Sequence, residues 1–340
     1  MQNLTSNSVY VIEEVGVDMN SRSVAIGVDI GGSKISAAAI DRHGKIVSSH
    51  TIATPLQSTE ATVDAVVGLI ENIKTVSSGI VEPVGIGIAV AGTVDSAHGA
   101  IVQSPNLPFS EIKLREIIEK RCGLPTVLDN DANLATFGEK HYGTARDASH
   151  VVGLTLGTGI GSGIICDGRL YRGATGSAAE LGHMVICATG PRCTCGSRGC
   201  FEEMASGRAL VRIAKERLAR DGGGLIGEMA GGDPERVTGP MVTEAARQGD
   251  IAANEVFAEV GFWLGIGINN IINIFNPEIV VIDGGMAEAG ELVLAPARAV
   301  VAERTLKPNK DVAKIVRGRL GNEAGMLGAA ALVFESFKVK

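Results

Sequence analysis

One short stretch of the chain places four potential metal ligands close together. His183 precedes three cysteines, Cys193, Cys195 and Cys200. Zinc binds cysteine sulfur and histidine nitrogen in a tetrahedral arrangement, so these four side chains could form a complete zinc site. Because such a site leaves no position for a water molecule, the zinc would stabilise the loop and would not activate a nucleophile.

Two acidic residues flank this candidate zinc loop, Glu180 before His183 and Glu202 after Cys200. A zinc ion that already has four ligands needs neither carboxylate. The residues alone leave two interpretations open. Either the metal holds a surface loop with two solvated carboxylates, or it fixes Glu180, His183 and Glu202 so that they bind a ligand rich in hydroxyl groups.

A glycine turn near the start of the chain could bind phosphate. It follows a predicted buried strand over 23–30 and contains Asp29, Gly31, Gly32, Ser33 and Lys34. Adjacent glycines let backbone N–H groups approach an anion, and the acidic side chain could hold Mg²⁺ through a water molecule. A Gly-Gly pair is also common in an ordinary hairpin, so this turn does not decide the function by itself.

The second half of the chain repeats this pattern. A strand predicted over 151–156 leads into Gly157, Thr158 and Gly159, and a returning strand is predicted over 162–167. Two such hairpins, each opening an α/β half, indicate an internal duplication whose two turns face each other across a cleft. Backbone N–H groups of both turns could then hold a phosphate chain. The chain contains no Gly-x-x-x-x-Gly-Lys-Ser/Thr motif, which excludes a P-loop nucleotide triphosphatase.

Two further strand ends carry polar or glycine residues. The strand predicted over 125–128 ends in a polar run: Asp129, Asn130, Asp131 and Asn133. Capping the helix that follows would explain one of these residues but not all four. The strand predicted over 278–282 runs into Gly284 and Gly285, where a flat ring or a phosphate could lie against the backbone.

The composition of the chain argues for some classes of protein and against others. The 340 residues suggest about two domains, and 45% hydrophobic with 20% charged residues is typical of a soluble globular protein. A net charge of −7 without a basic block argues against nucleic acid and membrane partners. The six cysteines, three of them in the candidate zinc loop, suit a reducing cytoplasm. Residues 1–22 lack the basic start and apolar run of a signal peptide.

The order of predicted strands and helices is that of an α/β protein. Helices are predicted over 57–77, 111–121, 134–142, 206–220, 242–248, 251–275 and 323–337. The glycine-rich segment 221–239 is predicted to be a mobile loop that contains some helix. The helix over 251–275 is apolar along its length, but Asn269, Asn270 and Asn273 favour a core helix over a membrane span.

Together these stretches resemble the ROK family of bacterial sugar kinases, open reading frames and repressors, within the actin-like ATPase superfamily. The most specific parts are Glu180-x-Gly-His183 and the Cys-x-Cys-Gly-x-x-Gly-Cys-x-Glu run that ends at Glu202. The two glycine hairpins look like the family's phosphate motifs, and the segment around Gly285 like its adenosine motif. The resemblance covers nearly the whole chain.

This resemblance implies a fold of two actin-like (ribonuclease H-like) α/β domains flanking a cleft, with a zinc-bound loop in the larger one. Residues 1–22 would be an N-terminal extension, and 23–130 a small domain joined by a C-terminal helix over 323–340. The large domain would span 131–322 and carry the zinc loop over 183–200. The implied cofactors are ATP, Mg²⁺ and structural Zn²⁺, in a cytoplasmic homodimer or homotetramer.

The resemblance also assigns roles to particular residues, with Asp131 as the general base. The sugar would contact Gly92, Asn106, Asn130, Asp131, Glu180, His183 and Glu202. ATP and its metal would contact Asp29, Gly31, Gly32, Ser33, Lys34, Gly157, Thr158, Gly159, Gly284 and Gly285. His183 would bind zinc through one ring nitrogen and the sugar through the other. Because Asp131 starts a helix, its ionised form should be favoured, which makes it a weak base that mostly orients the hydroxyl.

The implied reaction is phosphoryl transfer from ATP to a hexose, with glucose as the first choice. Kinases for N-acetylmannosamine, fructose, mannose and allose use much the same residues and remain alternatives. A sugar-responsive repressor would need a helix-turn-helix before the first strand, and 1–22 offers too few residues for one. A sugar-binding protein without turnover is a further alternative, against which Asp131 and both glycine turns argue.

Overall fold

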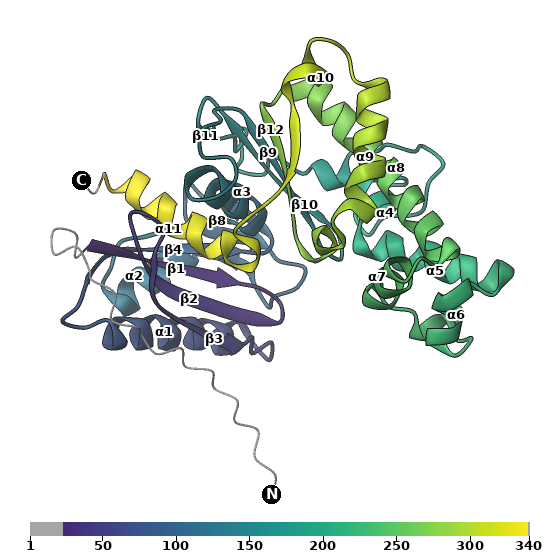
Figure 1. Cartoon of the computed structure of the whole chain (residues 1–340). Helices are drawn as coiled ribbons and strands as arrows, with labels where there is room; N and C mark the ends of the chain where they lie inside the picture. Colours follow the sequence, from purple (N-terminus) through teal and green to yellow (C-terminus); the bar gives the residue numbers. More distant parts are fainter. Residues whose placement is uncertain (1–22, 339–340) are drawn as a thin grey trace, which may run out of the picture. The chain divides into compact units, whose positions relative to one another are not determined.

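The computed structural model describes residues 23–338 as two units, each built on a five-stranded mixed sheet (Figure 1). The predicted extension over 1–22 lies outside the described residues. Of the described residues, the first unit contains 23–146, Leu170–Ala178 and 322–338. The second unit contains Asp147–Arg169 and Ala179–Gly321.

The sheet of the first unit has the strand order β3-β2-β1-β4-β8. The strands are β1 (Ser23–Ile30), β2 (Lys34–Asp41), β3 (Ile46–Ala53), β4 (Glu82–Val90) and β8 (Thr126–Asn130). β1, β2 and β3 pair antiparallel, whereas β1, β4 and β8 pair parallel. β1 and β4 are apolar and largely buried, as expected for strands that helices cover on both faces.

Two helices cover opposite faces of this sheet: α1 (Thr59–Val76) and the C-terminal helix α11 (Ala324–Ser336) (Figure 1). Glycines allow α11 to lie directly against the strands. A Cβ atom on Gly27 of β1 would clash with the carbonyl oxygen of Met326, and one on Gly87 of β4 with that of Ala329.

Helix α3 (Asp131–His141) also packs against α11, so the first unit continues past residue 130, where the sequence analysis placed the domain boundary. The remaining elements of this unit are α2 (Leu114–Cys122) and a small sheet of β5 (Thr93–Asp95), β6 (Ala100–Gln103) and β7 (Ser110–Ile112). The helix predicted over 111–121 therefore begins later than expected. Ile112 pairs with Ile101 of β6 in the small sheet and so is not available to start the helix.

The second unit repeats the sheet topology in the order β11-β10-β9-β12-β13. The strands are β9 (Val151–Leu156), β10 (Ile160–Cys166), β11 (Arg169–Leu170), β12 (Ile279–Asp283) and β13 (Lys314–Arg317). As in the first unit, a hairpin supplies the central strand β9, and two strands extend the sheet parallel to it. This agreement supports the internal duplication that the two glycine hairpins indicated.

Helices make up most of the rest of the second unit. They are α4 (Phe201–Ala205), α5 (Gly207–Asp221), α6 (Gly224–Ala230), α7 (Gly239–Arg247), α8 (Ile251–Phe275), α9 (Glu291–Arg304) and α10 (Asn309–Val312). The segment predicted as a mobile loop thus contains α6 and a 3₁₀ turn, Pro234–Arg236. The start of α6 is held by Asp250, whose carboxylate accepts a 3.0 Å hydrogen bond from the N–H of Leu225.

Helix α8 has the bounds that the sequence predicted and packs against α4, α5, α6, α7 and α9. Among the helices of residues 23–338 it is the one long and apolar enough to cross a membrane, and 56% of its most apolar window is buried within the structure. Its asparagines bond inside the fold: Asn269 accepts hydrogen bonds from Asn273 (3.2 Å) and Thr305 (3.0 Å). These are the features of a core helix.

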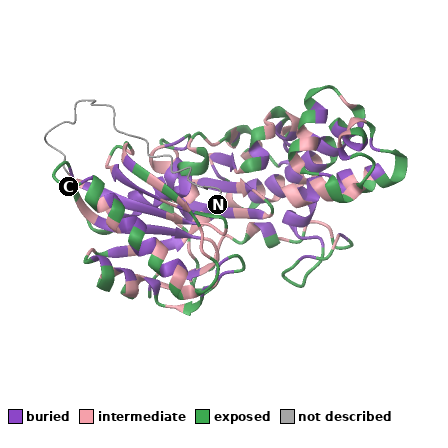
Figure 2. Cartoon of the chain, turned by 90° about the horizontal axis from the view of Figure 1, so that it is seen from below, coloured by how far each residue is buried: buried purple, intermediate pink, exposed green. Residues whose placement is uncertain are grey.

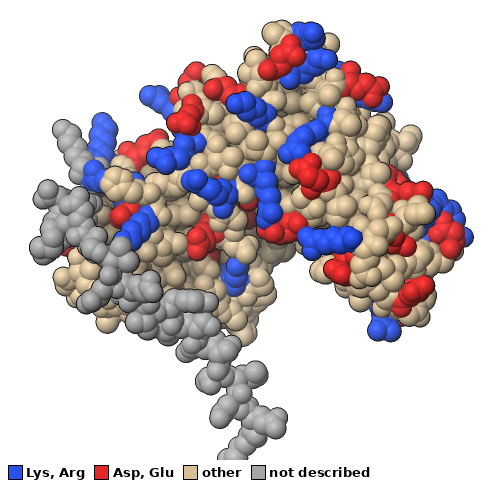
Figure 3. Space-filling view, in the orientation of Figure 1, with Lys and Arg blue, Asp and Glu red and all other residues tan. Residues whose placement is uncertain are grey.

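Each unit has its own hydrophobic core. Figure 2 shows the buried residues along the strands and on the inner sides of the helices, with exposed residues on the outer sides. Acidic and basic side chains are interspersed over the face shown in Figure 3.

Candidate functional site

The structure brings the four predicted zinc ligands together at the surface of the second unit. Their ligand atoms all lie within 4.8 Å of one another. Cys193 Sγ is 3.6 Å from His183 Nδ1, and Cys195 Sγ is 3.6 Å from Cys200 Sγ. A tetrahedron with zinc–sulfur bonds of about 2.3 Å has edges of about 3.8 Å, whereas a disulfide would need about 2.05 Å. The donor set therefore fits a zinc ion.

Local backbone geometry shapes this zinc loop. His183 ends a 3₁₀ turn, Leu181–His183, and the N–H of Gly196 bonds to the carbonyl of Cys193 at 3.0 Å. Gly199 has a φ of +65°, and a Cβ atom there would clash with the carbonyl oxygen of Cys187. Burial raises the pKa of the Cys193 thiol to about 12, so a bound cation would be needed to keep it as a thiolate.

Glu202 joins the zinc loop to the second glycine turn. Its side chain is 10% exposed, and its Oε1 accepts a hydrogen bond from Cys193 at 3.2 Å and lies 3.7 Å from His183 Nδ1. A Cβ atom on Gly159 would clash with the other carboxylate oxygen, so the turn passes directly beside Glu202. Glu180, the other predicted acid of this unit, is exposed.

A second group of predicted residues lies in the first unit, where β8 meets α3. Asn130 caps α3, because its Oδ1 accepts the N–H groups of Ala132 (2.9 Å) and Asn133 (3.1 Å). Its Nδ2 donates to the carbonyl of Gly92 at 3.1 Å. Much of the hydrogen-bonding capacity of Asn130 is therefore used inside the protein, which leaves one amide proton for a ligand.

The first glycine turn adjoins another predicted sugar residue. A Cβ atom on Gly32 would lie 3.1 Å from the Cβ atom of Asn106, which is exposed. Ser33 and Lys34, in the same turn, are exposed as well. Asn106 and the turn thus present polar groups side by side on the first unit.

Two carboxyl groups of the first unit, Asp29 on β1 and Asp131 on α3, have a raised pKa. Burial and, to a smaller extent, the charge of Asp131 raise the pKa of Asp29 to about 7, although Lys34 acts in the opposite direction. Burial also raises the pKa of Asp131, although the N–H of Ala132 donates to its Oδ1 at 2.9 Å. The expectation of a weakly basic Asp131 was wrong, because desolvation outweighs the helix N-terminus.

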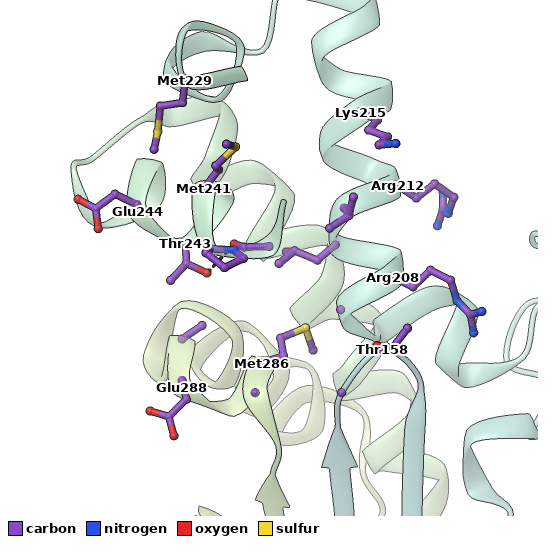
Figure 4. A pocket seen from close by; sticks show the side chains of 18 of the residues that line it. Thr158, Arg208, Arg212, Lys215, Met229, Met241, Thr243, Glu244, Met286 and Glu288 are labelled. Carbon is purple, nitrogen blue, oxygen red and sulfur yellow. Dashed lines mark hydrogen bonds between the residues drawn. The ribbon is translucent and has the colours of Figure 1, made fainter. Parts of the chain in front are cut away.

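A cavity of about 1240 Å³ lies within the second unit (Figure 4). Two glycine segments border it, through Gly157 and Thr158 after β9 and through Gly285 after β12. Helices α5, α6 and α7 and the turn after β12 supply the remaining lining, which includes Leu210, Val211, Met229, Pro240, Met241 and Met286. A partly apolar cavity bordered by glycine backbone suits a flat aromatic ring linked to phosphates.

Figure 4 shows how the side chains around this cavity are directed. Met229, Met241 and Met286 reach it from three separate elements, whereas the charged ends of Arg208 and Arg212 project away from it on the other side of α5. The N-terminus of α5 is tied to the glycine turn, because the N–H of Gly207 donates to the carbonyl of Gly157 at 2.9 Å.

The sequence analysis located the glycine members of this cavity but missed the helical ones. Met229 lies in the segment predicted as a mobile loop, and Met241 lies one residue before the helix predicted over 242–248, so the Gly239-Pro240 start of α7 was the available signal. Gly284, also predicted to bind ATP, does not border the cavity. Its φ is +90°, and a Cβ atom there would clash with the backbone of Leu156, so it allows the ends of β12 and β9 to approach each other.

The chain is similar to two kinds of known protein, glucokinases and xylose repressors. The chain is 39% identical over 315 residues to a glucokinase of Streptomyces coelicolor, covering 92% of this chain and 98% of that one. It is 31% identical to a xylose repressor of Bacillus spizizenii, covering 92% of this chain and 77% of the repressor.

A solved structure shows the same fold. It is a ROK family glucokinase from Streptomyces griseus in complex with glucose and AMPPNP, which is 38% identical and superposes with a TM-score of 0.78 over 91% of this chain and 98% of that one. Residues 25–336 match the ROK family as a whole. The chain that carries this zinc loop, these glycine turns and this cavity therefore belongs to the ROK family.

Proposed function

We propose that this chain is an ATP-dependent hexokinase of the cytoplasm that phosphorylates glucose on its 6-hydroxyl. The observation that carries the proposal is the similarity, over nearly the whole of both chains, to glucokinases of the same family. The raised pKa of Asp131 supports it, because a buried carboxylate with a raised pKa is a better base than a solvated one. The cavity beside the second glycine turn supports a nucleotide as the phosphoryl donor.

The proposed mechanism assigns a task to each group of residues. Asp131 accepts the proton of the sugar hydroxyl as the oxygen attacks the γ-phosphorus. Backbone N–H groups of the two glycine turns hold the phosphates in line with that oxygen. Asp29, when ionised, would hold Mg²⁺, which supplies charge neutralisation on the transferred phosphate. Zinc would keep His183 at a fixed distance from Glu202.

Selectivity for one hexose would come from fixed polar groups around the ring. Glu202 Oε1 lies 3.4 Å from Arg208 Nη2 and 3.7 Å from His183 Nδ1, so the other carboxylate oxygen cannot shift to suit another stereoisomer without losing these contacts. Glu180, Asn106 and Asn130 would contact the remaining hydroxyls. Mannose, fructose, allose and N-acetylmannosamine remain the competing acceptors, and a homodimer or homotetramer is the proposed assembly.

A coupled ADP-release assay with these five sugars tests the proposal. We expect the highest kcat/KM with glucose, and a higher value for another sugar would contradict the choice of substrate. Absence of ADP release with every sugar would contradict the kinase, and would favour a sugar-binding protein without turnover. The control is Asp131→Ala, which should lower kcat on the order of 10²- to 10⁴-fold while a glucose titration still shows binding. If Asp131→Ala kept more than about a tenth of kcat, Asp131 would not be the base.

A further inference from the structure

One short segment belongs to the first unit although the chain on both sides of it belongs to the second. This crossing loop, Leu170–Ala178, begins at the last residue of β11 and ends just before Ala179 and Glu180. It is closed on itself by a 3.1 Å hydrogen bond from the N–H of Ala178 to the carbonyl of Arg172. It also lies close to the first unit at Gly176, where a Cβ atom would be 2.8 Å from the carbonyl oxygen of Val94.

The side chain of Arg172 anchors the crossing loop to a buried carboxylate. Arg172 Nε donates to Asp129 Oδ2 at 2.6 Å, and the Asp129 side chain is 1% exposed. The other oxygen, Oδ1, accepts the backbone N–H of Asn130 at 2.8 Å and the Nδ2 of Asn133 at 2.9 Å. Both carboxylate oxygens are therefore bonded, and the guanidinium compensates a charge that would be costly to bury alone.

Asp129 stands at the junction between β8 and α3, immediately before the residues proposed to act on the sugar. Its contacts to Asn130 and Asn133 fix the backbone at the start of α3, where Asp131 is the first helical residue. Without a cation beside it, the Asp129 carboxylate would be an uncompensated buried charge and would be driven to move toward water. Such a movement would break the hydrogen bonds that hold this junction.

We propose that Arg172 is a positioning residue for Asp131, acting through Asp129 from a loop that the chain inserts into the first unit. In the sequence, the crossing loop leads directly into Ala179 and Glu180 of the second unit. This inference rests on the proposed kinase function. It adds Arg172 and Asp129 as residues that keep the base in its working position without touching the substrate.

The test compares two variants of the full-length protein: one removes only the positive charge of the ion pair, and the other removes both charges. We expect Arg172→Gln to lower kcat with glucose on the order of 10²-fold, because small displacements of a catalytic group have effects of this size. The KM for ATP should stay within about twofold, since the cavity lies in the second unit. The double variant Asp129→Asn/Arg172→Gln should regain at least about tenfold in kcat over Arg172→Gln, because an amide oxygen at position 129 can still accept from Asn130 and Asn133.

A matched control uses another ion pair of the first unit. Arg121 Nη1 lies 2.6 Å from Asp64 Oδ1, but these side chains are 39% and 56% exposed. Arg121→Gln should leave kcat unchanged, because exposed pairs contribute little. Should Arg172→Gln fail to fold, Arg172→Lys keeps the charge without the planar donor geometry and provides the same comparison of kcat with the KM for ATP.

Hydrogen–deuterium exchange gives a readout that does not depend on turnover. Arg172→Gln should speed exchange in a peptide covering 130–134, and the double variant should reverse that change. The inference is overturned if the Arg172 variants keep kcat within about twofold of wild type, or if the double variant is no better than Arg172→Gln. If the wild-type protein phosphorylates no sugar, the proposed function fails, whereas the exchange experiment still decides whether Arg172 holds the start of α3.

Discussion

At the scale of single residues, Asp29 and Asp131 determine how activity should depend on pH. Both carboxyl groups have a raised pKa, and the charge of Asp131 contributes to raising the pKa of Asp29. Near neutral pH the protein without ligands therefore holds a proton that an ordinary aspartate would have lost. Both proposed roles, binding Mg²⁺ and accepting the hydroxyl proton, require the ionised form.

We expect kcat/KM for MgATP to rise with pH up to about 7, the value to which burial raises the pKa of Asp29, and then to level off. The sign follows from the raised pKa, because the active ionised form is lost as pH falls through it. Measurements of kcat/KM for MgATP from pH 5.5 to 8.5 with saturating glucose would show this rise. Asp29→Asn, which cannot titrate, should lose most activity and show no rise at this position. A profile that is flat between pH 6 and 8 would contradict the assignment.

The cap formed by Asn130 was predictable, since a polar residue before a helix is a local signal. The anchor formed by Arg172 was not, because it joins residues 43 positions apart through a side chain from a segment without a motif. The raised pKa of Asp131 could not be predicted from the sequence either. Its direction depends on how much water the fold removes from around the carboxyl group, and the helix start that was visible in the sequence acts in the opposite direction.

At the scale of elements, the zinc loop is held partly by the fold and partly by its ligands. Leu181, Met184 and Ile186 pack against the core of the second unit, so the N-terminal end of the loop is anchored without metal. The stretch that carries the cysteines is held by backbone hydrogen bonds between residues close in the sequence. One example is the bond from the N–H of Cys193 to the carbonyl of Ser197 at 2.9 Å. Loss of metal should therefore loosen the cysteine stretch without unfolding the unit.

We predict that Cys195→Ser lowers the zinc content below one ion per chain and strongly raises the KM for glucose. The affinity for ATP should change little, because helices outside the loop line the cavity. Metal analysis and separate titrations of glucose and ATP would measure both effects. The matched control is Cys187→Ser, since Cys187 lies in the same region outside the four ligands. A zinc-free variant that binds glucose normally would separate the metal from the sugar site.

Both glycine hairpins could be predicted from the sequence, because their turns and their flanking apolar strands are adjacent in the chain. Helix α9 was not predicted, since Pro296 lies inside it and usually argues against a helix. The cavity was predictable only at its glycine border. Its helical walls come from α5, α6 and α7, whose relative packing depends on contacts distributed over the whole unit.

At the scale of the whole molecule, the two hydrophobic cores are separate, so the two units can respond differently to ligands. We predict two calorimetric unfolding transitions, of which a non-hydrolysable ATP analogue raises mainly one. At a hundred times its Kd such a ligand stabilises the state that binds it by about 2.7 kcal/mol. Limited proteolysis at intermediate temperature would identify the protected part as residues of the second unit. A single transition, or equal shifts of both, would show that the units unfold together.

The position of α11 has a consequence for how the protein is made. The residues of β1 and β4 leave the ribosome well before the helix that covers one face of their sheet. Nearly all of the second unit is synthesised before it. During synthesis Gly27 and Gly87 therefore leave a bare strip of backbone that only Met326, Ala329 and their neighbours are shaped to cover. The first unit can therefore be completed only after the second unit has been synthesised, and until then one face of its sheet stays uncovered.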